Sequence, residues 1–272
     1  MATYRKAPAR DTSTIRIGAF ETIRITREQL ADRMVDDCIS AREAREKGKA
    51  KIPKLVFSSN GQGIALAGQN GKFERLMGAA DIVHADGMPV VLASRLTRHP
   101  IAERIATTDF FHDAARAAAG AGLRFFFLGG TEKQNAEAVA RVREEYPTLS
   151  ISGRQHGYFL PEEVDELRQR IVSSETDVVW VALGKPAQEE WCVKMRHELR
   201  GVGWLKTCGG LYSFLADEAP RAPRWMQAAG LEWLHRVVND PRRLLWRYAT
   251  TNPYAAYRIL RHTDWSRRSP RA

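Results

Sequence analysis

One structural unit recurs along the chain: a short run of apolar, β-prone residues, then a glycine-rich or polar turn, then a helical pattern. The runs cover residues 55–59, 81–85, 123–130, 177–184 and 203–210. Strands that alternate with helices of this length form right-handed βαβ units on a mainly parallel sheet, with helices on both faces. The sequence therefore predicts an open α/β core.

Two prolines, Pro220 and Pro223, mark the end of this core, because proline breaks a preceding helix. We expect three segments. Residues 1–15 form a flexible basic N-terminus, residues 16–217 the α/β core, and residues 218–272 a helical appendage rich in arginine and tryptophan.

The appendage carries most of the net charge of the chain, which is +10. From Arg221 onward there are eleven arginines, no lysine and three acidic residues, and four of the seven tryptophans also lie there. Arginine grips phosphate with two parallel hydrogen bonds, and tryptophan settles at the boundary of a lipid headgroup layer. An anionic membrane and a nucleic acid both fit this composition.

Several classes of protein are excluded by what the sequence lacks. No run approaches the roughly 20 apolar residues of a membrane-spanning helix. The chain has three cysteines, Cys38, Cys192 and Cys208, and none of them forms a CxxC pair. This pattern predicts neither a disulfide framework nor a zinc site, and it is typical of a protein in the reducing cytoplasm. No GxGxxG, Walker lysine, HExxH or DxD motif is present, so we expect no NAD, ATP or metal cofactor.

The candidate functional residues follow the predicted strands, because open α/β sheets bind ligands at the carboxyl ends of their strands. The candidates at these ends are Ser58, Asn60, Asp86, Gly129, Gly130 and Gln188. The glycine turns could offer backbone N–H groups to a phosphate, or they could simply permit a tight turn.

Asp86 stands out among these residues because it ends a strand and precedes a Gly-Met-Pro turn. Such an acid can serve as a general base, or it can cap the next helix. Arg104 and Asp109 form a second polar group, in which Asp109 is expected to cap the helix that follows it.

The ordered set of motifs resembles the WecG/TagA/CpsF family of glycosyltransferases. The matching segments are SSN at 58–60, ADGMPVV at 85–91, ERIATTD at 103–109, FFLGG at 126–130, HGYF at 156–159, GKPAQEEW at 184–191, RAPRWMQAAGLEWLHR at 221–236 and DPRRLLWRY at 240–248. The resemblance implies a Rossmann-like core. It also implies transfer of a hexose or N-acetylhexosamine-type sugar from a UDP-sugar to a polyprenyl diphosphate-linked acceptor, in polysaccharide or exopolysaccharide synthesis.

The resemblance also implies roles for individual residues. Asp86 would be the base of an inverting attack. Ser58 would be the second catalytic residue; it stands where the family usually has threonine, and its hydroxyl could bond to the sugar or a phosphate. Asn60 and Arg104 match the family pattern of substrate-binding residues, with Arg104 suited to pyrophosphate, and Gln188 matches a residue that lines the nucleotide-sugar pocket. Basic residues that close over the active site correspond to Arg236, Arg243 and Arg247.

The expected location is the inner face of the bacterial cell membrane, where the protein would be peripheral, and a homo-oligomer fits the family. The sequence departs from the family at Tyr212, Ser213, Asp217 and Trp246. The alternatives are a nucleic-acid-binding module, which only the charge supports, a non-catalytic paralogue, and an NAD-dependent epimerase or dehydrogenase, which would need the missing dinucleotide motif.

Overall fold

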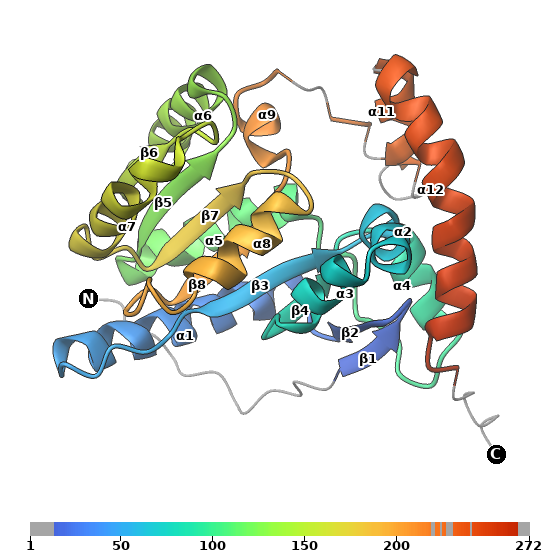
Figure 1. The fold of residues 1–272 in the computed structure, drawn as a ribbon, viewed down its shortest axis with the longest axis horizontal. Helices are drawn as coiled ribbons and strands as arrows, with labels where there is room; N and C mark the ends of the chain where they lie inside the picture. Colours follow the sequence, from blue (N-terminus) through green and yellow to red (C-terminus); the bar gives the residue numbers. More distant parts are fainter. Residues whose placement is uncertain (1–13, 219–220, 224, 227–230, 240, 266–272) are drawn as a thin grey trace.

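The computed structural model describes residues 14–218, 221–223, 225–226, 231–239 and 241–265 of the 272-residue chain (Figure 1). Most of the predicted flexible N-terminus lies outside these residues. Its last two residues, 14 and 15, already belong to a strand.

A six-stranded parallel sheet forms the centre of the molecule, in the order β4-β3-β8-β7-β5-β6. Its strands are β3 (Lys54–Ser59), β4 (Ile82–Ala85), β5 (Arg124–Gly129), β6 (Ser150–Gln155), β7 (Val178–Ala182) and β8 (Trp204–Thr207). The five predicted apolar runs are confirmed as strands. The sequence analysis missed β6, an edge strand that pairs only with β5 and carries half-buried, polar residues.

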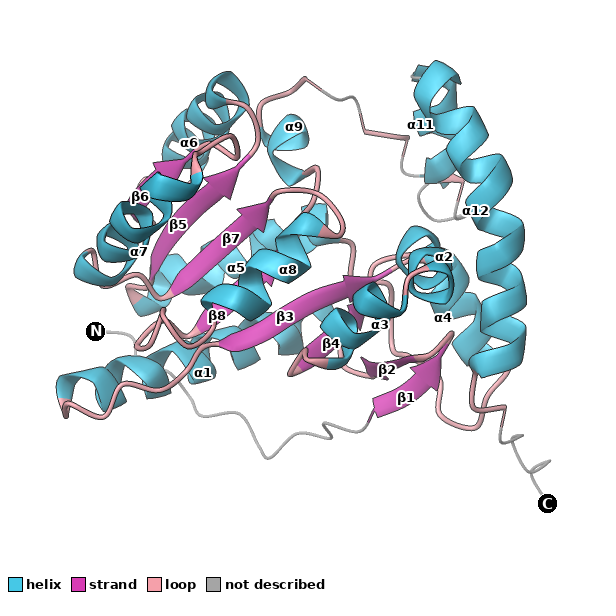
Figure 2. Ribbon diagram, in the orientation of Figure 1, coloured by secondary structure: helices cyan, strands magenta, loops and turns pink. Residues whose placement is uncertain are grey.

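Helices cover both faces of the sheet, as predicted (Figure 2). We call these faces the α5 face and the α8 face. Against the α5 face pack α1 (Arg27–Glu46), α5 (Thr107–Ala121), α6 (Glu132–Glu145) and α9 (Leu211–Leu215). The core of the α8 face includes side chains of α2 (Gly61–Gln69), α3 (Gly71–Gly78), α4 (Met88–Arg95), α7 (Val164–Ser173) and α8 (Ala187–Met195), with the short 3-10 helix η1 (Pro161–Glu163) leading into α7.

The two cores follow from the alternation of side chains along each buried strand. On β7 and β8, Trp180 and Trp204 lie in the core of the α5 face, whereas Val179 and Leu205 lie in that of the α8 face. A strand that is buried on both sides consists of an unbroken run of apolar residues. Such runs are visible in the sequence, so these strands could be predicted from it.

The chain after β3 forms two helices, α2 and α3, with Asn70 between them. Asn70 ends α2, and its side chain accepts hydrogen bonds from the N–H groups of Lys72 and Phe73 at the start of α3. An asparagine that caps a helix in this way competes with continuation of the preceding helix.

A separate antiparallel hairpin, β1 (Thr14–Ile17) and β2 (Phe20–Ile23), precedes the sheet and was not predicted. Gly18 and Ala19 form its turn, and both have positive φ angles. Turns of this kind match the right-handed twist of the paired strands.

The appendage contains α11 (Glu232–Asn239) and α12 (Pro241–His262), and α12 runs alongside α2 (Figure 1). Tyr254 donates a hydrogen bond to the carbonyl of Gly68 at 3.1 Å, and Arg258 pairs with Glu74 at 3.3 Å. Ala255 and Ile259 are buried in the core of the α8 face. The boundary at residue 217 stays a prediction.

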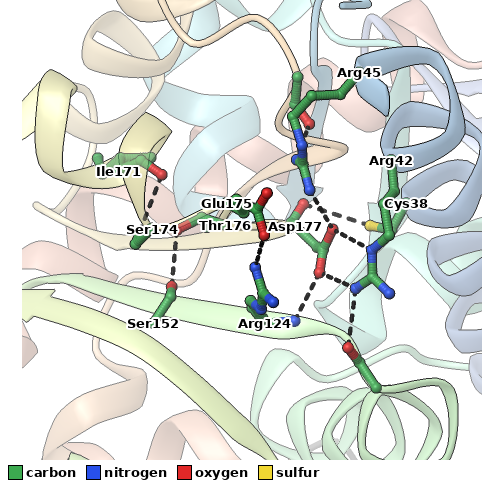
Figure 3. A network of polar contacts seen from close by, with 12 residues as sticks. Cys38, Arg42, Arg45, Arg124, Ser152, Ile171, Ser174, Glu175, Thr176 and Asp177 are labelled. Atoms are coloured by element: carbon green, nitrogen blue, oxygen red, sulfur yellow. Dashed lines mark hydrogen bonds and ion pairs between the residues drawn. The ribbon is translucent and has the colours of Figure 1, made fainter. Parts of the chain in front are cut away.

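At the edge where the strands begin, a dense polar network surrounds Asp177 (Figure 3). This carboxylate is 1% exposed, and it accepts hydrogen bonds from Arg42 and from the N–H of Arg124 at 2.8 Å. Its backbone carbonyl accepts from the N–H groups of Gly203 and Trp204. Asp177 therefore ties α1, β5 and β8 together.

Among the described residues, no helix is both long enough and apolar enough to cross a membrane.

Candidate active site

Asp86 lies directly after β4 at the carboxyl edge of the sheet, where it is partly exposed. Its Oδ1 accepts a hydrogen bond from the backbone N–H of Thr107 at 3.0 Å, at the start of α5. Its Oδ2 accepts from the side-chain amide of Asn60 at 3.3 Å. The positive end of the α5 dipole favours a negative charge at this point.

The alternative role for Asp86, as cap of the helix that follows it, is wrong. Gly87 is the N-cap of α4, and no side chain caps this helix. The carboxylate turns instead toward α5, about twenty residues further along the chain. This leaves Asp86 free to act at the sheet edge.

Asn60 is held next to Asp86 by two turns that pack closely. Its Oδ1 accepts a hydrogen bond from the N–H of Gly63 and so caps α2. The N–H groups of Asp86 and Gly87 both donate to the carbonyl of Ser59. A side chain at Gly87 would lie 3.1 Å from the Cα of Asn60, so glycine allows the two turns to meet.

Arg104 bridges Asp86 and the appendage. Its Nε donates to the backbone carbonyl of Asp86 at 2.8 Å, and its Nη2 contacts Glu232 of α11 at 2.6 Å. Burial lowers the pKa of the Arg104 guanidinium, but the carboxylates of Glu232 and Asp86 outweigh burial and raise that pKa above its ordinary value. The guanidinium is therefore charged and fixed above the site.

Ser58 and Gln188 lie on neighbouring elements that buried polar contacts connect. Ser58 is the last residue but one of β3, and its backbone carbonyl accepts a hydrogen bond from Lys185 at 3.2 Å. Lys185 also pairs with Glu189 at 2.9 Å, and Gln188 donates to the same carboxylate oxygen. The side-chain carbonyl of Gln188 accepts a hydrogen bond from the N–H of Gly209, two residues after the end of β8.

Unpartnered polar atoms gather at this same edge of the sheet. Nine buried side-chain nitrogen and oxygen atoms of the described residues have no hydrogen-bond partner of good geometry, and five of them belong to Ser59, His84, Glu189 and Thr207. All four residues are 0% exposed. Ser59 and Thr207 end β3 and β8, His84 lies in β4, and Glu189 lies in α8, the helix after β7. Such atoms usually indicate bound water or a functional site.

Gly129 and Gly130 lie at the same edge but not in the Asp86 cluster, because β8 and β7 separate β5 from β3. A side chain at Gly129 would meet the carbonyl of Ala182 on β7 at 2.3 Å. Both glycines have positive φ angles. The structural role of these residues is thus a tight turn beside β7, and phosphate binding stays a prediction.

The expectation that Asp109 caps its helix is wrong, because Ala106 is the N-cap of α5. Asp109 lies in the first turn of that helix and pairs with Arg221 at 2.7 Å and with Arg27 at 3.6 Å. An acid in the first turn favours the helix dipole without capping it. Its contact with Arg221 joins α5 to the start of the appendage.

The three arginines expected to close over the site lie in the appendage helices, Arg236 in α11 and Arg243 and Arg247 in α12. Their side chains lie outside the described part of the structure.

The sequence analysis did not single out three residues that contact the candidate site residues: Thr107, Glu189 and Glu232. It also did not single out Lys206, a fully buried lysine in the short strand β8. Thr107 acts through its backbone, and Glu232 acts across 128 positions of sequence, so neither contact has a local sequence signal.

No group of three or more histidine, cysteine, aspartate or glutamate side chains that could hold a metal ion occurs among the residues the structure describes.

Comparison with known proteins gives two findings. The model of the family described as "Glycosyl transferase WecG/TagA/CpsF family" matches residues 23–269. The chain is also 33% identical over 197 residues to an N-acetylglucosaminyldiphosphoundecaprenol N-acetyl-beta-D-mannosaminyltransferase from Bacillus spizizenii. That alignment covers 71% of this chain and 74% of the relative.

Proposed function

Because the chain belongs to the WecG/TagA/CpsF family of glycosyltransferases, we propose that it transfers a hexose or N-acetylhexosamine-type sugar from a UDP-sugar to a polyprenyl diphosphate-linked saccharide. The reaction would invert the anomeric carbon and need no metal. The name of the Bacillus relative makes N-acetylmannosamine the first donor sugar to test.

The observation that carries this proposal is the setting of Asp86. Its carboxylate is partly exposed at the ligand-binding edge of the sheet, and two hydrogen bonds, from Thr107 and Asn60, fix its orientation. A general base must be reachable by the acceptor and held in place, and Asp86 meets both conditions.

In the proposed reaction, Asp86 accepts the proton of an acceptor hydroxyl group. The hydroxyl oxygen forms a bond to the anomeric carbon from the face opposite the nucleotide. The bond from that carbon to the β-phosphate oxygen breaks, and its electron pair leaves with UDP. Attack from the opposite face inverts the configuration, and one proton passes from the acceptor to the carboxylate.

The departing UDP gains negative charge, and positive side chains would stabilise it. Arg104 supports this role because it is charged and is held beside Asp86. Arg236, Arg243 and Arg247 are the proposed partners from the appendage. Arginines that neutralise the leaving group would replace the divalent cation used by other sugar-nucleotide enzymes.

Ser58, Asn60 and Gln188 are the proposed residues of the donor pocket. Ser58 lies in β3, Asn60 follows that strand, and Gln188 lies in α8, the helix after β7. The strands β3 and β7 pair with the two sides of β8. Gly129 and Gly130 are separated from β3 by the strands β8 and β7, and Asp109 lies in the first turn of α5. We propose that these three residues also bind the substrate.

The appendage is the proposed contact with an anionic membrane at the inner face of the cell membrane. Its helices expose large apolar side chains, namely Val238 at 72%, Leu245 at 61%, Trp246 at 76%, Tyr257 at 57% and Leu260 at 68%. Exposed aromatic groups next to arginines suit a lipid headgroup layer, where each arginine contributes about 1 kcal/mol.

The test of the transferase proposal measures UDP released from a panel of UDP-sugars. The acceptor is a synthetic polyprenyl diphosphate-linked N-acetylglucosamine, and EDTA is present. We expect release that depends on the acceptor. Release that EDTA abolishes would contradict the metal-independent mechanism. No release with any donor, across a series of lipid acceptors, would contradict the proposed reaction.

The membrane proposal is tested with Trp246→Ala and a matched control, Tyr158→Ala. Both side chains are 76% exposed, but Tyr158 lies outside the appendage. We expect the Trp246 variant to bind anionic liposomes several-fold more weakly and the Tyr158 variant to bind normally. Equal binding by both variants would contradict the assignment. The homo-oligomer stays a prediction, which analytical ultracentrifugation can test.

A further inference from the structure

Glu232, the first residue of α11, directs its carboxylate at Arg104. Its Oε2 accepts a hydrogen bond from Nη2 of Arg104 at 2.6 Å, and the side chains of Glu232 and Arg104 are only 10% and 17% exposed. A buried carboxylate is costly unless an opposite charge compensates it. Arg104 supplies that charge, so the position of Glu232 is matched to the guanidinium.

The contact fixes the guanidinium of Arg104 at a second point. Its Nε donates to the backbone carbonyl of Asp86 at 2.8 Å, while its Nη2 contacts Glu232. A guanidinium is planar and carries five N–H donors in a fixed fork, so contacts at two of its nitrogens set the direction of the remaining donors. Those remaining donors are the ones that can meet a diphosphate.

Glu232 also has a large influence on the charge of Arg104. Burial lowers the pKa of the guanidinium, and Glu232 raises it through both its charge and its hydrogen bond, with Asp86 and Asp109 adding to the rise. The net shift is upward. Glu232 therefore helps to keep Arg104 charged as well as oriented.

The helix that carries Glu232 has an anchor of its own, which begins at the C-terminal end of α12. There the backbone carbonyl of His262 accepts a hydrogen bond from the N–H of Ala19 at 3.3 Å, and the hydroxyl of Thr263 accepts one from the N–H of Gly18 at 3.2 Å. Gly18 and Ala19 form the turn of the β1–β2 hairpin. Together with the contacts between α12 and α2, these hydrogen bonds hold α12 on the core.

α11 is held on α12 in turn. The ring of Trp233 on α11 packs against that of Tyr248 on α12, with centroids 5.8 Å apart. The docking of α11 therefore has contacts besides the one between Glu232 and Arg104. A role for this ion pair in the reaction can be separated from a role in holding the appendage.

We propose that Glu232 is a positioning residue for Arg104: its carboxylate orients the guanidinium so that the remaining N–H donors meet the negative charge that develops on the departing diphosphate. This inference rests on the proposed function, in which Arg104 stabilises the UDP leaving group. Glu232 acts through Arg104 and forms no bond to the substrate.

The experiment measures kcat and the donor KM of UDP release for the full chain and for Glu232→Gln, which removes the charge and keeps the shape. We expect kcat about tenfold lower and a KM for the UDP-sugar within about twofold of wild type, because the lost orientation matters most in the transition state.

The matched control is Glu74→Gln. It makes the same chemical change in another ion pair between the appendage and the core, that of Glu74 with Arg258 at 3.3 Å. We expect wild-type kcat and KM for this variant. A loss of activity equal to that of Glu232→Gln would show that docking of the appendage, rather than orientation of Arg104, explains the effect.

A double variant separates positioning from docking in a second way. Arg104→Gln should lower kcat by itself, and adding Glu232→Gln to it should cause no further loss, because Glu232 then has no guanidinium to orient. Two neutral glutamines leave no buried charge uncompensated, so the double variant should fold even where a single variant does not. Thermal melting of all the variants checks their folding.

Three outcomes overturn the inference while the wild type transfers sugar. The first is a wild-type kcat for Glu232→Gln. The second is a loss from Glu232→Gln that is equally large with and without Arg104. The third is an unchanged kcat with a KM several-fold lower, which would mean that Glu232 competes with the diphosphate for Arg104. If the wild type itself transfers no sugar, the proposed function is wrong, and the Glu232 inference falls with it.

Discussion

At the edge where the strands begin, the buried carboxylate of Asp177 has a donor for each of its oxygens, whereas at the edge where they end, Ser59, Thr207 and Glu189 each keep an oxygen without a partner. The two edges belong to the same sheet, and these four side chains are all at most 1% exposed. The first edge uses its polar groups to join elements, and the second leaves polar groups available. The comparison separates residues that hold the fold from residues that can serve chemistry.

The largest effect should come from Asp86→Asn at the carboxyl edge. Loss of a general base lowers kcat by about 10²–10⁴-fold, and the isosteric amide should leave the melting temperature within a few degrees of wild type. Steady-state kinetics and thermal melting of the same preparations check this. A large drop in melting temperature would mean that Asp86 belongs with the structural residues.

The converse is expected for Asp177→Ala at the amino edge. Removing this carboxylate takes away the ion-pair partner of Arg42 and leaves the backbone N–H of Arg124 without its acceptor, at a cost of about 3–5 kcal/mol in the free energy of unfolding. Urea denaturation measures this cost. The control is Asp165→Ala, whose side chain is 87% exposed and which should cost almost nothing. Activity per folded molecule should be normal for both variants.

The buried lysine Lys206 makes the stability of the sheet depend on pH. The unfolded chain holds this proton up to about pH 10.5, and the folded chain releases it near 8. Unfolding therefore takes up a proton between these values, and the stability of the folded state rises with pH across that window, by about 1.4 kcal/mol for each unit of pKa difference.

The measurement compares the free energy of unfolding of wild type with that of Lys206→Met at pH 7 and at pH 10. The difference cancels the titration of other groups. Any stability advantage of the methionine variant should shrink at the higher pH. An advantage that is the same at both values would show that Lys206 carries no buried charge at pH 7.

The smallest effect should come from a matched pair of threonines. Thr207 at the carboxyl edge is fully buried and its hydroxyl has no partner, whereas Thr176 at the amino edge shares hydrogen bonds with Ser152 and Ser174. Thr207→Val should change stability by less than about 1 kcal/mol or increase it, and Thr176→Val should cost about 1–2 kcal/mol. Equal losses, measured by thermal melting, would remove the contrast.

The sheet was predictable from sequence because its strands are buried on both faces. Apolar runs such as residues 177–182 are typical of buried parallel strands. Because the carboxyl ends of parallel strands lie at the same edge of the sheet, the sequence also predicts that Ser58 and Asp86 lie at that edge. The half-buried strand β6 and the hairpin of β1 and β2 lack such a run. Their pairing depends on contacts that periodicity does not encode.

The contacts of the candidate site were less predictable than its location. The partner of Asp86 is a backbone N–H 21 residues away, and every residue but proline has one. The bridge from Arg104 to Glu232 depends on how α11 docks. Residue identity at a strand end indicates that a group is present, but the packing of helices decides which group it meets.

The two hydrogen bonds of the Asp86 carboxylate differ in how they tolerate genetic change. The bond from Asn60 needs an amide side chain, so most substitutions at this position remove it. The bond from residue 107 comes from the main chain, and any residue that fits the space and is not proline preserves it. During divergence, position 107 can therefore vary while its contribution to the site persists, and a count of invariant residues would underestimate it.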